Sequence, residues 1–440
     1  MGKILRYALG LVKTAVEGVR LEGGRAVVSV RPWAREGLRC PVCGRRCEHY
    51  DTARSPRLWR AMDAGRLRCY LEYRVRRVRC PEHGVRAERV PWARPRSRFT
   101  RDFEDWVACL AVRCCASAVA ELARVEWHTV GGVCARVFAD LEASRGAGRL
   151  DGLRRIGVDE TSYRKGHRYI TVVVDHGTGR LVWAGEGTGK EVLRGFLSQM
   201  TREQRRSVEV VTADGARWIR ALCRRWLPNA RWVMDPFHVV SWMNDALEGV
   251  RRGEWRRAKA AADAARPRRD RPGRPRKGEE APAAYLEAKA EADAVRGTRW
   301  ALLKDPGDLT DGQRAKLEAL KRRAGSHLLR AWELKEDLRA VFRAGSAAEA
   351  GRLLDAWLHD AAYCRVPEVV RVEKKVRRRR DDVLAAVGLG IGNGRVESLN
   401  NKVKVAVRMG YGFRNVDNLI SLLMLRCSDI KPALPGRQTA

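Results

Sequence analysis

Two short segments near the N-terminus carry residues whose types and spacing fit metal chemistry. RCPVCG contains Cys40 and Cys43, and RCPEHG contains Cys80 and His83. Each segment presents two ligands on a tight turn, and together they supply the four ligands of a closed tetrahedral Zn²⁺ site. A structural zinc ion can contribute about 10–16 kcal/mol of folding free energy. The sequence therefore predicts one structural zinc ion in a small module with little apolar surface to bury.

The other cysteines have plainer interpretations. Cys47 lies close enough in the sequence to compete for the metal. Cys69 and the adjacent Cys114 and Cys115 fall on strand or helix patterns, where buried free thiols are the usual explanation. Ordinary reduced cysteines throughout the module are the alternative to a zinc site. In both interpretations the 12 cysteines are free thiols or metal ligands, as expected of an intracellular protein, rather than the disulfide bonds of a secreted one.

Three acidic residues form a second candidate site. Asp159 follows the apolar run RIGV, Asp214 follows VVTA, and Glu397 lies at the start of a helical pattern far along the chain. Carboxylates brought within a few ångströms repel one another by roughly several kcal/mol per pair, so their convergence needs cations. Oxygen-only ligands favour Mg²⁺ or Mn²⁺, and a pair of such ions serves phosphoryl transfer.

Each of these acids also has a structural interpretation, as a cap at a strand end or as a solvated helix residue. Asp175, which ends YITVVVD, is the main rival for a place in the site. The other acids that complicate the choice are Glu160 and Asp235. His238 in DPFHVV is assigned no chemistry. The residues alone leave the choice of acids open.

The charge balance indicates a polyanionic partner. Lysine and arginine number 88 against 53 acidic residues, so the net charge is 88 − 53 = +35, far beyond what solubility requires. No run of 18 apolar residues and no signal pattern is found, so we expect a soluble, intracellular protein with no membrane partner. A hydrophobic fraction of 45% and 14 tryptophans indicate folded cores rather than a basic tail.

The elements that must position these residues begin with short strands and then helices. Segments such as AVVSVRP and LRCYLEYRVRRVRC alternate β-branched and aromatic residues with arginines, which predicts a β-rich module up to about residue 90. Helical spacing from Phe99 to Leu141 predicts three successive helices. The apolar positions of this pattern include Phe103, Val107, Val119, Leu122 and Val133.

ASAVAELARVEWHTVGGVCARVF has the layout of a helix-turn-helix. Trp127, His128 and Thr129 would begin the recognition helix, which reads base edges in the DNA major groove while nearby arginines contact phosphates. The alternative is a helical hairpin that packs only for its own stability.

From Arg154 the sequence predicts β-β-β-α-β-α-β, with three antiparallel-compatible strands followed by parallel additions to the same sheet. Residues 240–385 are predicted to be almost wholly helical. They are interrupted by RPRRDRPGRPRKGEEAP, which cannot pack and is predicted to be an exposed loop on the DNA backbone. The basic residues assigned to DNA binding there are Arg274, Arg276 and Lys277.

Helical periodicity resumes from Arg395 to Met409. The apolar positions of this pattern are Val396, Leu399, Val403 and Val407. Lys402, Lys404 and Arg408 lie on the same helix as Glu397 and are candidates to hold the DNA backbone. A solvated basic face is the alternative.

These segments together resemble the ISL-three (ISL3) family of bacterial insertion-sequence transposases, within the DDE class, over nearly the whole chain. The resemblance rests on CPVCG, RCPEHG, SRFT, GVDETSYRKGHRYITVVVD, VVTADGARW, DPFHVV, LLRAWELKEDLR and, most specifically, NGRVESLNNKVKVAVRMGYGFRN. It implies that Asp159, Asp214 and Glu397 are the D, D and E positions of a ribonuclease-H-like core, interrupted by a helical insertion. His83 is a departure, because the family pattern has cysteine there; zinc also accepts imidazole.

The resemblance implies a DNA transposase that binds the ends of its insertion sequence, exposes a 3′ hydroxyl and joins it to target DNA. Its partners would be double-stranded DNA and copies of itself in a synaptic homo-oligomer, and its location the bacterial cytoplasm, on the nucleoid. A non-catalytic DNA-binding regulator and a non-transposing nuclease of the same fold are the alternatives.

We therefore predict a multidomain α+β chain with a ribonuclease-H-like α/β catalytic core. Its expected parts are a zinc-binding β-rich module (1–95), a helix-turn-helix region (96–150), the first part of the core (151–240), a mostly helical insertion (241–388) with a basic loop near 263–282, and a core completion carrying Glu397 (389–440).

Overall fold

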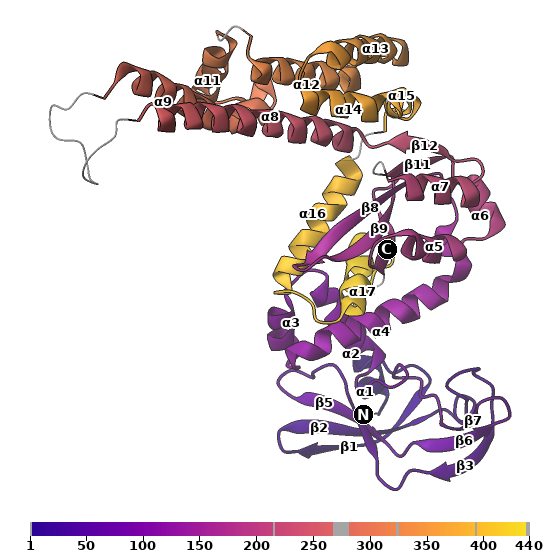
Figure 1. Ribbon diagram of the computed structural model, residues 1–440. Coiled ribbons are helices and arrows are strands. Elements are labelled where there is room, and N and C mark those ends of the chain that lie inside the picture. The colour runs from indigo at the N-terminus through magenta and orange to yellow at the C-terminus, as the bar shows by residue number, and fades with distance from the viewer. Residues whose placement is uncertain (1, 214–215, 267–280, 323–324, 392–393, 437–440) are drawn as a thin grey trace. The chain divides into compact units, whose positions relative to one another are not determined.

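The computed structural model describes residues 2–213, 216–266, 281–322, 325–391 and 394–436 (Figure 1). The chain forms two compact units. Unit 1 comprises Met1–Gly152, Glu160–Thr201 and Ser398–Ala440, and unit 2 comprises Leu153–Asp159 and Arg202–Glu397. The architecture is mixed α and β, as predicted.

Unit 1 begins with a short helix and two small β-sheets, and the helix was not predicted. The helix is α1 (Gly2–Ala8). The first sheet has the order β1-β2-β5-β4, with β1 (Thr14–Glu22), β2 (Arg25–Pro32), β4 (Arg57–Arg60) and β5 (Arg68–Tyr73). The second has the order β3-β6-β7, with β3 (Glu48–Thr52), β6 (Arg76–Cys80) and β7 (Gly84–Ala87), paired antiparallel.

The first sheet encloses a small apolar core. Val28 and Leu71 are almost fully buried, and the rings of Trp59 and Trp92 meet edge to face with centroids 5.6 Å apart. A core of this size stabilises a small module only marginally, so modules of this kind often rely on a metal or a disulfide. The cysteine-containing turns of the same module are therefore placed where a metal would matter.

Three helices follow, as predicted: α2 (Arg101–Ala111), α3 (Ala116–Ala123) and α4 (Trp127–Arg145), then η1 (Gly146–Leu150). Thr100 caps α2 by accepting a hydrogen bond from the Phe103 amide at 3.3 Å. Leu122, one of the apolar positions of the predicted helical spacing, is 57% exposed. Val119 and Ala123 form the buried face of α3, and Leu122 is rotated by about 100° from Ala123.

A five-stranded mixed sheet has the strand order β10-β9-β8-β11-β12. Its strands are β8 (Arg155–Arg164), β9 (Arg168–Asp175), β10 (Leu181–Glu186), β11 (Val210–Ala213) and β12 (Arg231–Met234), with α5 (Lys190–Ser198), α6 (Arg202–Ser207) and α7 (Arg217–Trp226) between them. β9 and β10 are antiparallel, whereas β11 is parallel to both β8 and β12. The predicted change from antiparallel to parallel strands is confirmed; the short α6 was not predicted.

The rest of unit 2 is helical, as predicted. Its helices are α8 (Pro236–Ala264), α9 (Ala283–Arg296), α10 (Arg299–Leu303), η2 (Pro306–Asp308), α11 (Asp311–Lys321), α12 (His327–Arg343), α13 (Ala347–Tyr363), α14 (Pro367–Arg377) and α15 (Arg380–Gly388). The long helix α8 packs against α9, α12 and α14, as Figure 1 shows. Arg274, Arg276 and Lys277 of the predicted basic loop lie outside the described residues.

The last two helices are α16 (Gly394–Met409) and α17 (Val416–Cys427). Val396, Leu399 and Val403 are buried on α16, as the periodicity predicted. The fourth buried position is Ala406 rather than Val407, which is half-buried, because the helical repeat falls between three and four residues. None of the helices in the described part of the chain is long and apolar enough to cross a membrane.

Candidate metal centre, DNA-binding helix and carboxylates

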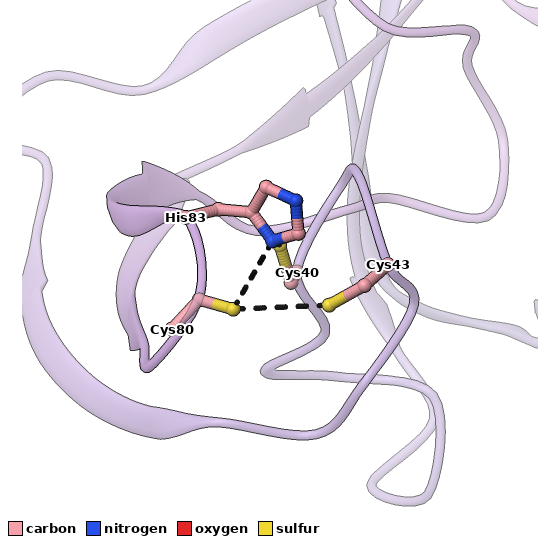
Figure 2. A group of neighbouring side chains, drawn as sticks. All are labelled: Cys40, Cys43, Cys80 and His83. Atoms are coloured by element: carbon pink, nitrogen blue, oxygen red, sulfur yellow. Dashed lines mark hydrogen bonds between the residues drawn. The ribbon is translucent and has the colours of Figure 1, made fainter.

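The structure brings together the four predicted zinc ligands, Cys40, Cys43, Cys80 and His83, as Figure 2 shows. All four ligand atoms lie within 4.8 Å of one another. The Sγ atoms of Cys43 and Cys80 are 3.7 Å apart, and His83 Nδ1 lies 3.5 Å from Cys80 Sγ and 3.8 Å from Cys40 Sγ. Tetrahedral zinc with ordinary bond lengths requires about 3.8 Å between sulfurs and about 3.5 Å between sulfur and nitrogen. The donor set fits zinc.

Both ligand pairs lie on turns that end in glycine. In the first turn, the Cys40 amide donates to the Arg45 carbonyl at 2.9 Å, and Gly44 has φ +71°. The second turn joins β6 to β7, with Cys80 paired to Gly84, whose φ is +68°. This left-handed backbone is accessible to glycine at little cost. Backbone hydrogen bonds therefore shape each turn, and the two turns together present the four ligands.

The electrostatics at one of these ligands, Cys80, favour the thiolate form. A hydrogen bond with His83 is the main cause that lowers the pKa of Cys80 to about 6, from the usual 9.0. Metal ligation by cysteine requires that deprotonated form. Cys47, the predicted competitor, is not a member of the four-ligand group, and its thiol faces the Arg45 carbonyl at 3.4 Å.

The helix-turn-helix layout is confirmed in its local geometry. α3 ends where Arg124 adopts φ 53°, and α4 begins at Trp127, as predicted. Trp127 is 61% exposed, His128 is exposed and Thr129 is half-buried. The following turns of α4 are largely covered, with Val130 and Val133 buried against α2, α3 and α17. The first turn of α4 is therefore accessible to a ligand, whereas the turns directly after it are packed on neighbouring helices.

The candidate carboxylates have different surroundings. Asp159 is half-buried and lies inside β8 rather than at its end. Glu397 is exposed in the first turn of α16, as predicted. Asp214 directly follows β11 and lies outside the described residues. In the part of the chain that the structure describes, the four zinc-type ligands are the only group of three or more acidic, cysteine or histidine residues close enough to hold a metal.

The rival acids have structural partners. Asp175 accepts hydrogen bonds from the Gly177 amide at 2.8 Å and the Thr178 hydroxyl at 2.7 Å, and so holds the turn after β9. Glu160 accepts from the amide of Gly189, the residue that caps α5, at 3.0 Å.

Asp235 is a third rival with a structural partner, because it caps α8. It accepts from the Phe237 amide at 3.0 Å, and its Oδ2 lies 2.5 Å from His238 Nδ1. His238, to which the sequence assigned no chemistry, thus contacts the carboxylate that caps α8.

The basic residues of α16 are exposed. Lys402, Lys404 and Arg408 all face solvent, whereas Val403 and Ala406 between them are buried. This arrangement fits both a phosphate-contacting face and a solvated one.

Sequence reasoning did not find a buried ion-pair network in unit 1. Glu104 is fully buried on α2 and is paired with Arg94 at 3.3 Å and Arg136 at 2.7 Å. Asp105 and Asp140 also pair with Arg94. The signal available in the sequence was a charged residue at a core-facing helical position, next to Phe103.

Comparison with known proteins defines the class of protein. Residues 156–423 match the model of a family described as "Transposase". Residues 88–137 match the helix-turn-helix domain of transposase family ISL3, and residues 36–83 match the zinc-finger of transposase IS204/IS1001/IS1096/IS1165. The zinc-type cluster, the helix-turn-helix and the mixed sheet therefore belong to a transposase, an enzyme class that cleaves and transfers DNA.

Named relatives cover nearly the whole chain. A transposase for insertion sequence element IS1557 from Mycobacterium tuberculosis is 40% identical over 99% of this chain and 97% of the relative. A transposase for insertion sequence element IS1001 from Bordetella parapertussis is 26% identical over 88% of each chain. This chain belongs to the ISL3 family of insertion-sequence transposases.

Proposed function

We propose that the chain binds the ends of its insertion sequence and cuts and joins DNA strands with Asp159, Asp214 and Glu397. The observation that carries this proposal is the register of two parallel strands of the sheet. Thr212 of β11 is paired with Gly157 of β8. Asp159 is two residues after Gly157, and Asp214 is two residues after Thr212. Equal offsets along parallel paired strands support a shared site for the two acids.

Glu397 supplies the third acid by a different route. It belongs to unit 2 together with Asp159, and it follows α15, which packs on β12 of the same sheet. Its side chain is exposed, so it can accept a ligand without first breaking an internal contact. The strand order β10-β9-β8-β11-β12 and the helical segment between β12 and α16 support a ribonuclease-H-like core with an insertion.

The three acids would hold Mg²⁺ or Mn²⁺, which when bound activates the attacking oxygen and stabilises the leaving oxygen of an in-line displacement at phosphorus. In the first displacement water is the attacking group, and the leaving group is the 3′ hydroxyl of the element end. In the second, that hydroxyl attacks a phosphodiester of target DNA and displaces the 3′ oxygen of the target strand, which leaves as a 3′ hydroxyl. Lys402, Lys404 and Arg408 would hold the DNA backbone beside Glu397.

The remaining parts would recognise and assemble the substrate. The first turn of α4 would read the terminal sequence, and Arg274, Arg276 and Lys277 would contact phosphates regardless of sequence. Structural zinc would stabilise the N-terminal module. A homo-oligomer on the nucleoid would bring the two ends of the element together. Within each chain, the functional segments would be residues 1–95, 96–150, 151–240, 241–388 and 389–440.

A strand-transfer assay tests this proposal. The substrate is DNA carrying the inverted repeats that flank the gene of this chain, with Mg²⁺ and a supercoiled target. A transposase joins the ends to the target, a nuclease only cuts them, and a regulator only binds them. Joining by the natural chain, and its loss in Asp159→Asn with end binding retained, is the expected result. Binding without cutting by the natural chain would show that the proposal is wrong.

A further inference from the structure

A groove in unit 1 lies between the start of α4 and the turn that follows α16. Its volume is about 880 Å³, and the aromatic residues that line it include Trp127, His128, Tyr411 and Phe413. Ligand pockets of about 300–1,000 Å³ take molecules of nucleotide size, whereas a double helix is too wide to enter one. The groove therefore combines aromatic surfaces with enough room for an unpaired nucleotide.

The turn after α16 holds one aromatic ring out into solvent. Tyr411 has φ +49° and is 93% exposed, although a tyrosine rarely adopts that backbone. A Cβ at Gly410 would lie 2.7 Å from the Phe413 ring, so glycine lets this ring pack closely on the backbone. The Gly412 amide donates to the Val407 carbonyl at 3.0 Å and fixes the turn. Strain retained around an exposed aromatic side chain is typical of a binding site.

The charge of the groove suits an anion. Arg164, Arg414 and Arg426 line it, and neither aspartate nor glutamate does. Arg426 is held in place by donating to the Val112 carbonyl at 2.9 Å. Within the described residues, no ion pair involves Arg164 or Arg414. Guanidinium groups without a carboxylate partner are available for phosphate.

The floor of the groove is tightly packed. α4 and α17 pack against each other, and a Cβ at Gly131 of α4 would lie 2.6 Å from Asn418 Nδ2 of α17. Asn415, which also lines the groove, caps α17 by accepting from the amides of Asp417 and Asn418. The walls are therefore built on two helices that touch closely rather than on isolated loops.

We propose that this groove binds one base that is unstacked from DNA, with the base stacked on Tyr411 and a neighbouring phosphate held by Arg164 or Arg414. The proposal rests on the proposed function, since it assigns the groove to the DNA that the transposase processes. Stacking on an aromatic face accepts any base, and an unpaired base costs least to extract. The groove thus adds recognition of distorted DNA to sequence reading by α4.

Two duplexes of the same sequence test the proposal, one fully paired and one with a single unpaired thymine, in buffer without Mg²⁺. The natural chain should bind the duplex with the unpaired thymine about 10-fold more tightly, since stacking on an aromatic residue gives about 5- to 150-fold per base. Tyr411→Ala should abolish this preference and leave the affinity for the paired duplex within about twofold. Tyr411→Phe, which keeps the ring, should retain it.

Tyr7→Ala is the matched control, because Tyr7 is also in unit 1 and is 91% exposed, yet it does not line the groove. It should keep the preference. The proposal is overturned if the natural chain shows no preference, if Tyr411→Ala keeps it, or if Tyr411→Ala weakens both duplexes equally. It is also overturned if Tyr411→Ala alters only self-association, since the groove would then hold a second copy. Asp159→Asn should still bind the duplex with the unpaired thymine more tightly. A failure of the strand-transfer proposal can therefore be told apart from a failure of this one.

Discussion

The zinc-type cluster and the candidate carboxylates differ in how the chain assembles them. Cys40, Cys43, Cys80 and His83 come from two turns of one small module, and their ligand atoms lie within 4.8 Å of one another. The proposed acids come from a strand, from the residue after another strand and from a distant helix. A local ligand set can be completed by turn geometry. A long-range set depends on sheet register and on the return of the chain after a long insertion.

The two sets also differ in how much they contribute to the stability of the fold. The cluster sits in a module with a small core, so a bound metal would contribute directly to stability. Asp159 and Glu397 lie on elements that already pack through other residues, such as Val158 and Val396. Loss of the cluster should therefore unfold a region, whereas loss of an acid should remove chemistry and leave the fold.

The largest expected effect is removal of the zinc ligands. Cys40→Ser combined with Cys80→Ser should abolish zinc binding and destabilise the N-terminal module by about 10 kcal/mol, because folding and metal binding are coupled. Elemental analysis should show about one zinc per natural chain and far less in the variant. Hydrogen exchange should show loss of protection in β3, β6 and β7.

Cys47→Ser is the control for this change, since Cys47 is outside the four-ligand group. It should keep the zinc content and the protection of the natural chain. A variant with both ligand cysteines replaced that still holds one zinc would break the comparison between the two sets.

The next largest effect concerns the acids. Glu397→Gln and Asp159→Asn should each lower cleavage by at least on the order of 10³-fold, with end binding and thermal stability unchanged. Combining them should cost little more than one alone, because groups acting as a unit are strongly non-additive. Single-turnover kinetics measure the cleavage rate, and a DNA-binding titration measures the affinity for the element ends.

Asp175→Asn sharpens the assignment of the first acid. Asp175 holds a turn through Gly177 and Thr178, so its replacement should affect stability slightly and leave cleavage near normal. Abolished cleavage in Asp175→Asn, together with normal cleavage in Asp159→Asn, would transfer the role to Asp175.

A third prediction contrasts two acids within the same chain. Glu104 is buried and paired with Arg94 and Arg136, so Glu104→Gln should lower the free energy of unfolding by about 3 kcal/mol. Glu397→Gln should leave the unfolding free energy within about 0.5 kcal/mol, because Glu397 is exposed. Chemical denaturation compares them. Equal destabilisation by both changes would place Glu397 in a structural role.

The smallest effect is expected at adjacent glycines of α4. Gly131→Ala places a Cβ 2.6 Å from Asn418 Nδ2 and should destabilise the chain by about 1–3 kcal/mol. Gly132→Ala meets only Arg136 Nη1 at 3.6 Å and should stabilise it by about 0.5–1 kcal/mol through helix propensity. Melting temperatures that move in the same direction for both variants would contradict this packing of α4 on α17.

Much of the secondary structure was predictable because it depends on local periodicity. The three helices α2 to α4, the succession of strands β8 to β12 along the chain and the helical run from α8 to α15 all follow from patterns of apolar residues. Leu122 and Val407 belong to the predicted helical patterns but lie off the buried faces of α3 and α16, because the helical repeat falls between three and four residues. The short helix α1 has no buried residue, so its apolar residues Ile4, Leu5 and Tyr7 do not mark a core-facing side.

The sequence by itself determined the four zinc-type ligands, because the ligand types and their spacing occur in two similar turns that each end in glycine. It also determined the start of α4 at Trp127 and the position of Glu397 in the first turn of a helix. The tertiary structure decided what depends on contacts between distant segments. It gave Asp175, Glu160 and Asp235 structural partners, buried Glu104 among arginines and brought Tyr411 to the same groove as Trp127. Such juxtapositions depend on packing between elements far apart in the chain, and no local pattern encodes them.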